Sequence, residues 1–113
     1  MHELSIMESA LQKAVDRALA SGATRICVIK LRIGALSGVV PEALQFAFPS
    51  VSHGTIAESA TLEIETAPGR FWCNVCRNEF SSQAMIGECP VCQTPSAELR
   101  SGRQMELVSM EIE

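Results

Sequence analysis

The chain has 113 residues, 47% of them hydrophobic and 19% charged, a composition typical of one globular domain or of a small domain with a satellite. Its net charge of -4 argues against nucleic acid or an anionic membrane as a partner, because both require a positive protein surface. The N-terminus lacks a secretion signal and no stretch approaches the roughly 18 apolar residues of a membrane span, so we expect a cytoplasmic protein.

The first predicted element is a helix over about residues 4–19. Its apolar residues, beginning with Leu4, Met7 and Leu11, recur every three or four positions and therefore share one face. Gly22 follows at the position where a glycine caps a helix in the left-handed conformation.

A strand is predicted next, over residues 25–33, where β-branched residues are frequent and apolar and basic residues alternate. A short apolar helix is expected from Pro41 to Phe48, since proline suits the first turn of a helix. Pro49 should kink or end this helix.

Two further strands are predicted, over residues 61–66 and 105–112, and the cysteine-rich segment lies between them. We therefore expect an α+β fold with two helices packed on a small sheet of about three strands. Residues 1–67 and 103–113 should form this domain, and residues 68–102 an inserted zinc-ribbon module.

Four cysteines, Cys73, Cys76, Cys89 and Cys92, form two CxxC pairs separated by twelve residues. A CxxC turn presents two sulfurs to one ion, and four thiolates fill a tetrahedral site. The pattern predicts a structural Zn²⁺ with no open position for catalysis. A disulfide pair and a rubredoxin-like iron site remain alternatives.

The other candidate ligands are more isolated in the sequence. Cys27 lies on the first predicted strand, where a small buried hydrophobe is the expected role. His53 lies beside Gly54 in a predicted loop, with no second ligand near it in the sequence.

The N-terminus offers a second candidate metal site. The terminal amine of Met1, the backbone nitrogens and the imidazole of His2 can converge on one ion, and such a set favours square-planar Ni(II) or Cu(II). A solvated histidine near a chain end is the alternative.

The sequence resembles the HypA/HybF hydrogenase nickel-incorporation proteins. The resemblance rests on MHELSI at 1–6, IGALSGVVPEALQFAF at 33–48, the paired CxxC at 73–92 and GRQMELVSMEIE at 102–113. It covers essentially the whole chain. It implies a nickel metallochaperone that binds Ni(II) through the amine of Met1, the imidazole and backbone nitrogen of His2, and Glu3.

The same resemblance implies partners. These are a HypB-like GTPase, the large subunit of a [NiFe] hydrogenase and, in some members, the urease maturation proteins; the chain would act as a monomer or a homodimer. One departure concerns the glycine that often follows each CxxC in the family. Arg77 and Gln93 replace it here, which predicts less relaxed turns.

A zinc-ribbon adaptor that binds protein or nucleic acid is the rival interpretation. An enzyme is not expected, because the sequence offers no nucleophile paired with a base, no glycine-rich phosphate loop and no open zinc position.

Overall fold

A computed structural model describes residues 3–84 and 86–113. The chain divides into two compact units, which are described separately. The first contains Met1–Arg32, Val39–Glu65 and Glu106–Glu113, and the second contains Ile33–Gly38 and Thr66–Met105.

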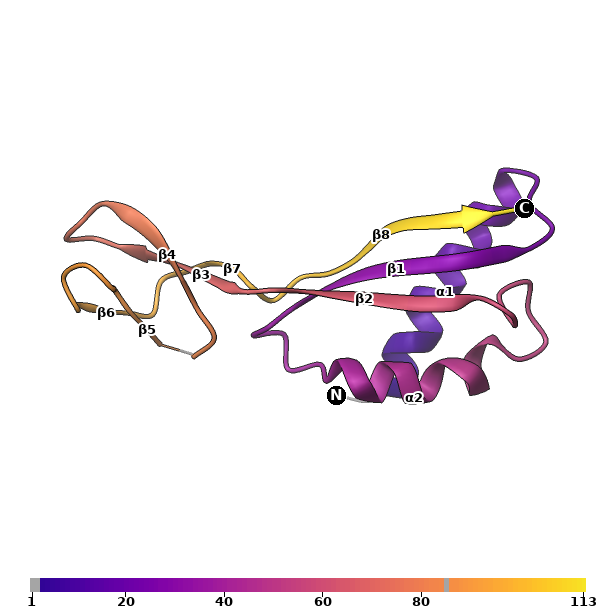
Figure 1. Cartoon of the computed structure of the whole chain (residues 1–113), viewed down its shortest axis with the longest axis horizontal. Coiled ribbons are helices and arrows are strands. Elements are labelled where there is room, and N and C mark those ends of the chain that lie inside the picture. The colour runs from indigo at the N-terminus through magenta and orange to yellow at the C-terminus, as the bar shows by residue number, and fades with distance from the viewer. Residues whose placement is uncertain (1–2, 85) are drawn as a thin grey trace. The chain divides into compact units, whose positions relative to one another are not determined.

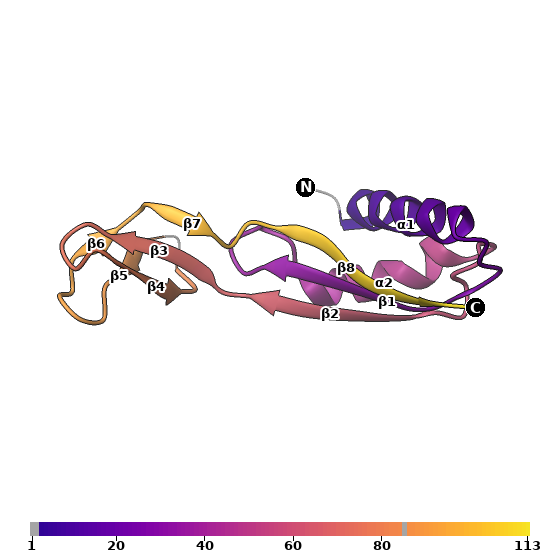
Figure 2. The ribbon, with the colours of Figure 1, turned by 90° about the horizontal axis from the view of Figure 1, so that it is seen from above.

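Two helices and a three-stranded sheet build the first unit, which confirms the predicted α+β fold (Figure 1). The helices are α1 (Glu3–Ala20) and α2 (Pro41–Ser52), and they contact each other. The sheet has the order β2-β1-β8, with β1 at Ile26–Gly34, β2 at Thr61–Ala67 and β8 at Met105–Ile112. In Figure 2, β1 and β2 run in the same direction and β8 runs in the opposite one.

The alternation of β1 separates two faces of the sheet. Ile29 and Leu31 are each 1% exposed and lie in the apolar core with Met7 and Leu11 of α1. Arg32 lies on the opposite face and forms ion pairs with carboxylates on both neighbouring strands, at 3.4 Å to Glu65 Oε1 and 3.6 Å to Glu106 Oε2. One face of the sheet therefore carries the core and the other carries charges.

Gly22 ends α1 as predicted, with a positive φ of 79°. The N–H of Ala23 donates to the Ala18 carbonyl and the N–H of Gly22 donates to the Leu19 carbonyl, each at 3.0 Å. This pair of bonds is a Schellman motif, which requires a left-handed residue at this position.

Pro49 is expected from the sequence to kink or end the second helix, and of these two alternatives the ending is wrong. α2 continues through Pro49 to Ser52. Leu44, Phe48 and Ser52, four residues apart, are all buried. Burial of this face offsets the one backbone hydrogen bond that the proline cannot donate.

The second unit contains two small sheets. One has the order β4-β3-β7, with β3 at Gly69–Cys73, β4 at Asn78–Ser82 and β7 at Leu99–Ser101. The other pairs β5 (Gly87–Glu88) with β6 (Pro95–Ser96). Its sheets share a small core cluster of two phenylalanines and two cysteines: Phe71, Phe80, Cys73 and Cys89.

Backbone segments of this unit pack closely around three of its glycines. A Cβ on Gly34 would lie 2.1 Å from the Gly102 carbonyl oxygen, and a Cβ on Gly102 would lie 2.7 Å from the Gly69 Cα. The Leu36 N–H donates to the Gly102 carbonyl at 2.8 Å. The three glycines therefore allow three separate chain segments to pass in contact.

Candidate metal centre

Two short turns hold the candidate ligands of the second unit. Cys73 ends β3 and Cys76 follows within a turn, while Cys89 and Cys92 form the second turn after β5. In each turn the residue after the CxxC closes the loop. The N–H of Arg77 donates to the Cys73 carbonyl and the N–H of Gln93 donates to the Cys89 carbonyl, both at 2.8 Å.

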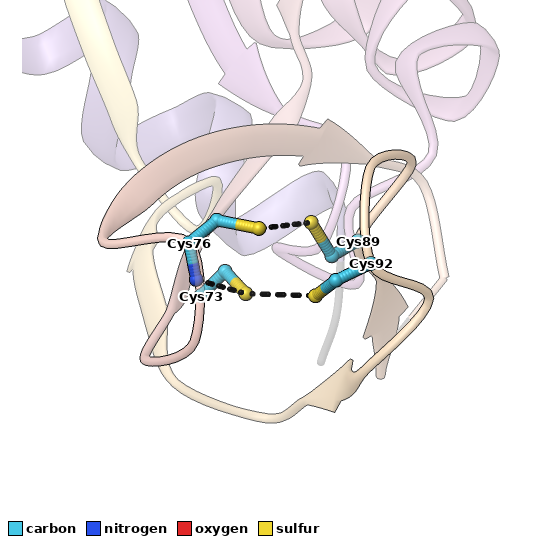
Figure 3. A group of neighbouring side chains, drawn as sticks. All are labelled: Cys73, Cys76, Cys89 and Cys92. Atoms are coloured by element: carbon cyan, nitrogen blue, oxygen red, sulfur yellow. Dashed lines mark hydrogen bonds between the residues drawn. The ribbon is translucent and has the colours of Figure 1, made fainter.

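The four sulfurs face one another across the gap between the turns (Figure 3). All four lie within 4.8 Å of one another, with 3.5 Å between Cys73 and Cys92 and 3.9 Å between Cys76 and Cys89. In a tetrahedral site with Zn–S bonds of ~2.3 Å, neighbouring sulfurs are about 3.8 Å apart. The arrangement could therefore hold one metal ion with little movement.

Electrostatics also favours a cation here. Hydrogen bonds from the Thr94 hydroxyl and backbone N–H lower the pKa of the Cys92 thiol to about 6. By contrast, its hydrogen bond to Cys92 raises the pKa of Cys76 to about 12. Four ionised thiols at this spacing repel one another, and a divalent cation at the centre removes that cost.

Disulfides are not formed in the structure, where all five cysteines are free. The sulfurs of the closest pair, 3.5 Å apart, are well beyond the bonded distance of about 2.05 Å.

The expected nickel ligands are the first three residues of the chain. Met1 and His2 lie outside the described residues, so their role stays a prediction. Glu3 opens α1 and is partly buried, in the first turn where a carboxylate is favoured by the helix dipole.

Cys27 and His53 are not brought to the four-cysteine cluster. Cys27 is only partly buried, and its Sγ lies 3.3 Å from the Glu113 Oε2, so the expected role as a core hydrophobe is wrong. Cys27 is the second residue of β1, at the end of the sheet, where the polar side chain of Glu113 contacts it. His53 is 81% exposed, with its Nδ1 3.5 Å from the Glu58 carboxylate.

Thr94 is a site residue that sequence reasoning missed. Its Oγ1 lies 3.1 Å from Cys92 Sγ, and its carbonyl accepts a hydrogen bond from the Cys89 N–H at 3.1 Å. A hydroxyl two residues after a CxxC is a weak signal by itself, because such residues also occur in ordinary turns.

Comparison with known proteins agrees with these observations. A family described as "Hydrogenase/urease nickel incorporation, metallochaperone, hypA" matches residues 1–112. A hydrogenase maturation factor HypA from Picosynechococcus is 45% identical over 112 residues, covering 99% of each chain. Another, from Dechloromonas aromatica, is 40% identical over 113 residues, covering all of both chains.

Solved structures show the same fold. The solution structure of the Ni metallochaperone HypA from Helicobacter pylori matches with a TM-score of 0.69 and 24% identity, covering 99% of this chain and 97% of that one. A second solution structure of a HypA protein matches with a TM-score of 0.71. Within the described residues, no helix is both long and apolar enough to cross a membrane.

Proposed function

This chain belongs to the HypA family of hydrogenase and urease nickel-incorporation metallochaperones, and from that premise we propose that it binds Ni(II) at its N-terminus and delivers it during [NiFe] hydrogenase maturation. The observation that carries the proposal is the family match, which spans residues 1–112 and so includes both candidate metal sites. Family membership makes the chain a maturation factor and not an enzyme. Urease is the second candidate client, since the family description includes it.

The nickel site of this proposal consists of the Met1 amine, His2 and Glu3. Nitrogen donors from an amine, the backbone and an imidazole suit Ni(II). A site at a chain end also suits a carrier, because few packed contacts must break when the metal leaves. Nickel is cargo here, and its release to a client requires only that the client offer a stronger ligand set.

The second metal of the proposal is a structural Zn²⁺ on Cys73, Cys76, Cys89 and Cys92. Four sulfurs at near-tetrahedral spacing leave no position for a water or substrate, which is typical of structural zinc. The thiolates require a reducing compartment, so the proposal includes a cytoplasmic location.

The two sites would divide the chain into a nickel-binding part, residues 1–67 and 103–113, and a zinc-binding part, residues 68–102. The partners in this proposal are a HypB-like GTPase, which would supply the GTP hydrolysis that this chain does not perform, and the hydrogenase large subunit. GTP hydrolysis by this partner would drive nickel delivery in one direction.

Calorimetric titration with Ni(II) tests the nickel site, using untagged protein with zinc already bound. We expect one nickel site in the unaltered chain and its loss in the His2→Ala variant. The His53→Ala variant is the matched control, because His53 is an exposed histidine away from the N-terminus. Equal nickel binding by the unaltered chain and the His2→Ala variant would refute the proposed site.

A further inference from the structure

We propose that Cys76 is the reactive sulfur of the metal-loaded cysteine centre, attacked first by an electrophile such as a peroxide, and that its oxidation releases the metal. The inference rests on the proposed function only in requiring that the four cysteines bind a metal ion. It adds a modification site at which the metal-bound state of the second unit can be lost.

The four sulfurs differ in the hydrogen bonds that they accept. Cys73 Sγ accepts one from the Cys76 N–H at 3.4 Å, and the backbone N–H groups of Cys92 and Val91 lower the pKa of Cys89. Cys92 Sγ lies 3.1 Å from the Thr94 hydroxyl oxygen, to which it donates as a thiol; as a metal-bound thiolate it has no proton, so in that state the Thr94 hydroxyl is the donor. Among the described residues, no backbone N–H or hydroxyl donates to Cys76, whose sulfur contacts only other cysteines.

A hydrogen bond to a thiolate withdraws charge from the sulfur, and such partners of metal ligands tune the reactivity of a site. A metal-bound thiolate with no such donor keeps more charge and is the better nucleophile. Cys76 is therefore the most nucleophilic of the four on hydrogen bonding alone.

Access to solvent points to the same residue. Cys73 and Cys89 are 1% and 3% exposed, so a reagent in water cannot reach their sulfurs easily. Cys76 and Cys92 are both partly exposed. Solvent access therefore leaves Cys76 and Cys92 as the candidates for first attack. The Thr94 hydroxyl lowers the nucleophilicity of Cys92 only.

Sequence differences between the two turns explain the asymmetry. Asn78 holds the position in the first turn that Thr94 holds in the second, two residues after the CxxC. The Asn78 Oδ1 accepts a hydrogen bond from the Glu79 N–H at 3.0 Å. No hydroxyl is present at this position to donate to Cys76.

The oxidation proceeds in two balanced steps. The Cys76 thiolate attacks one oxygen of hydrogen peroxide; the S–O bond forms, the O–O bond breaks and hydroxide leaves, so sulfur loses the two electrons that the peroxide gains. The Cys89 thiolate, 3.9 Å away, then attacks the sulfur of the sulfenic acid. An S–S bond forms, the S–O bond breaks and a second hydroxide leaves. Only Cys73 and Cys92 would then remain as ligands, and the ion dissociates.

The test uses the full chain in a Cys27→Ser background, so that the one cysteine outside the cluster cannot react. Zinc content is measured first. The loaded protein is then treated with limiting iodoacetamide or hydrogen peroxide. Tandem mass spectrometry locates the modified cysteine, and a chromogenic chelator follows zinc release.

Thr94→Val and Thr94→Ser provide matched variants that keep all four ligands. We expect Cys76 to be modified first in the unaltered chain. Thr94→Val should speed alkylation of Cys92, because its thiolate loses the hydroxyl that withdraws charge, and should leave the rate at Cys76 unchanged. Thr94→Ser keeps the hydroxyl and should react like the unaltered chain.

The outcomes separate this inference from the proposed function. A chain that holds no metal before treatment would refute the zinc site and this inference with it. A chain that holds zinc but reacts first at Cys92, Cys73 or Cys89, or whose Cys92 is insensitive to Thr94→Val, would refute the reactive role of Cys76 alone.

Discussion

Arg77 and Gln93 hold the same position in the two cysteine turns, and both adopt the left-handed conformation, with φ of 55° and 63°. Each donates its N–H to the carbonyl of the cysteine four residues earlier, at 2.8 Å. Among the described residues, they are the only ones other than glycine with a positive φ. The fold therefore accepts backbone strain at both turns to point the sulfurs at one another.

Replacing these residues with glycine should stabilise the metal-loaded protein. A left-handed residue with a Cβ costs about 1–3 kcal/mol, whereas glycine adds about 0.5–1 kcal/mol of unfolded-state entropy. We expect Arg77→Gly and Gln93→Gly each to raise the free energy of unfolding by up to about 2.5 kcal/mol, the difference between these two ranges, measured by chemical denaturation.

Asn74→Gly is the control for this prediction, because Asn74 is exposed in the first turn and lacks a positive φ. There the same change should destabilise by about 0.5–1 kcal/mol. Equal losses at all three positions would show that the left-handed conformations carry no strain.

Metal removal should unfold the second unit and leave the first one intact. Its two buried phenylalanines contribute about 3–6 kcal/mol at ~1.5–3 kcal/mol each, whereas structural zinc contributes about 10–16 kcal/mol in small finger peptides. After chelation, amide exchange should accelerate in β3 and β4. Protection should persist in α1 and β1, and unchanged protection in β3 would contradict the prediction.

The regular elements and the cysteine cluster could be predicted because each depends on a local pattern. Alternation placed β1 within a residue of its observed ends, and paired CxxC spacing predicted that four sulfurs meet. The continuation of α2 past Pro49 depended on burial of Phe48 and Ser52, which is a tertiary effect. The hydroxyl of Thr94 gained its role only from its position beside Cys92.

The nickel ligands show a different limit. Whether the Met1 amine and His2 bind nickel depends on a small set of donors that leaves no periodic pattern. Family resemblance supplied that prediction, and the titration described above tests it.

Glu113 should contribute stability that is lost in acid. Its carboxylate accepts a hydrogen bond from Cys27 Sγ and pairs with the Arg25 guanidinium, and these two contacts lower the pKa of Glu113. Because the folded pKa is below the unfolded one, this stabilisation is complete above the unfolded value, about 4.3 for glutamate, and disappears as the pH falls through the folded value.

The Glu113→Gln variant should therefore be less stable than the unaltered chain at pH 7 and equally stable near pH 2. The loss should be small, because the ion pair is well exposed to solvent. Thermal melts at both pH values measure it. Glu111→Gln is the control, an exposed carboxylate on β8, and a loss that persists at pH 2 would show that charge is not the cause.

Gly34→Ala should be the most destabilising of these changes. The new Cβ would lie 2.1 Å from the Gly102 carbonyl oxygen and 2.8 Å from the Arg103 backbone nitrogen, so a backbone segment must move. Overpacking of this kind costs at least about 1–3 kcal/mol, and the Gly34 N–H also donates to the Gln104 carbonyl at 2.7 Å.

Gly38→Ala separates this clash from conformational strain, because Gly38 has a φ of 82° but no atom within 4 Å of its added Cβ. Chemical denaturation should show a loss of about 1 kcal/mol for Gly38→Ala and a clearly larger one for Gly34→Ala. Similar losses for the two variants would mean that the segments at Gly34 and Gly102 separate without cost.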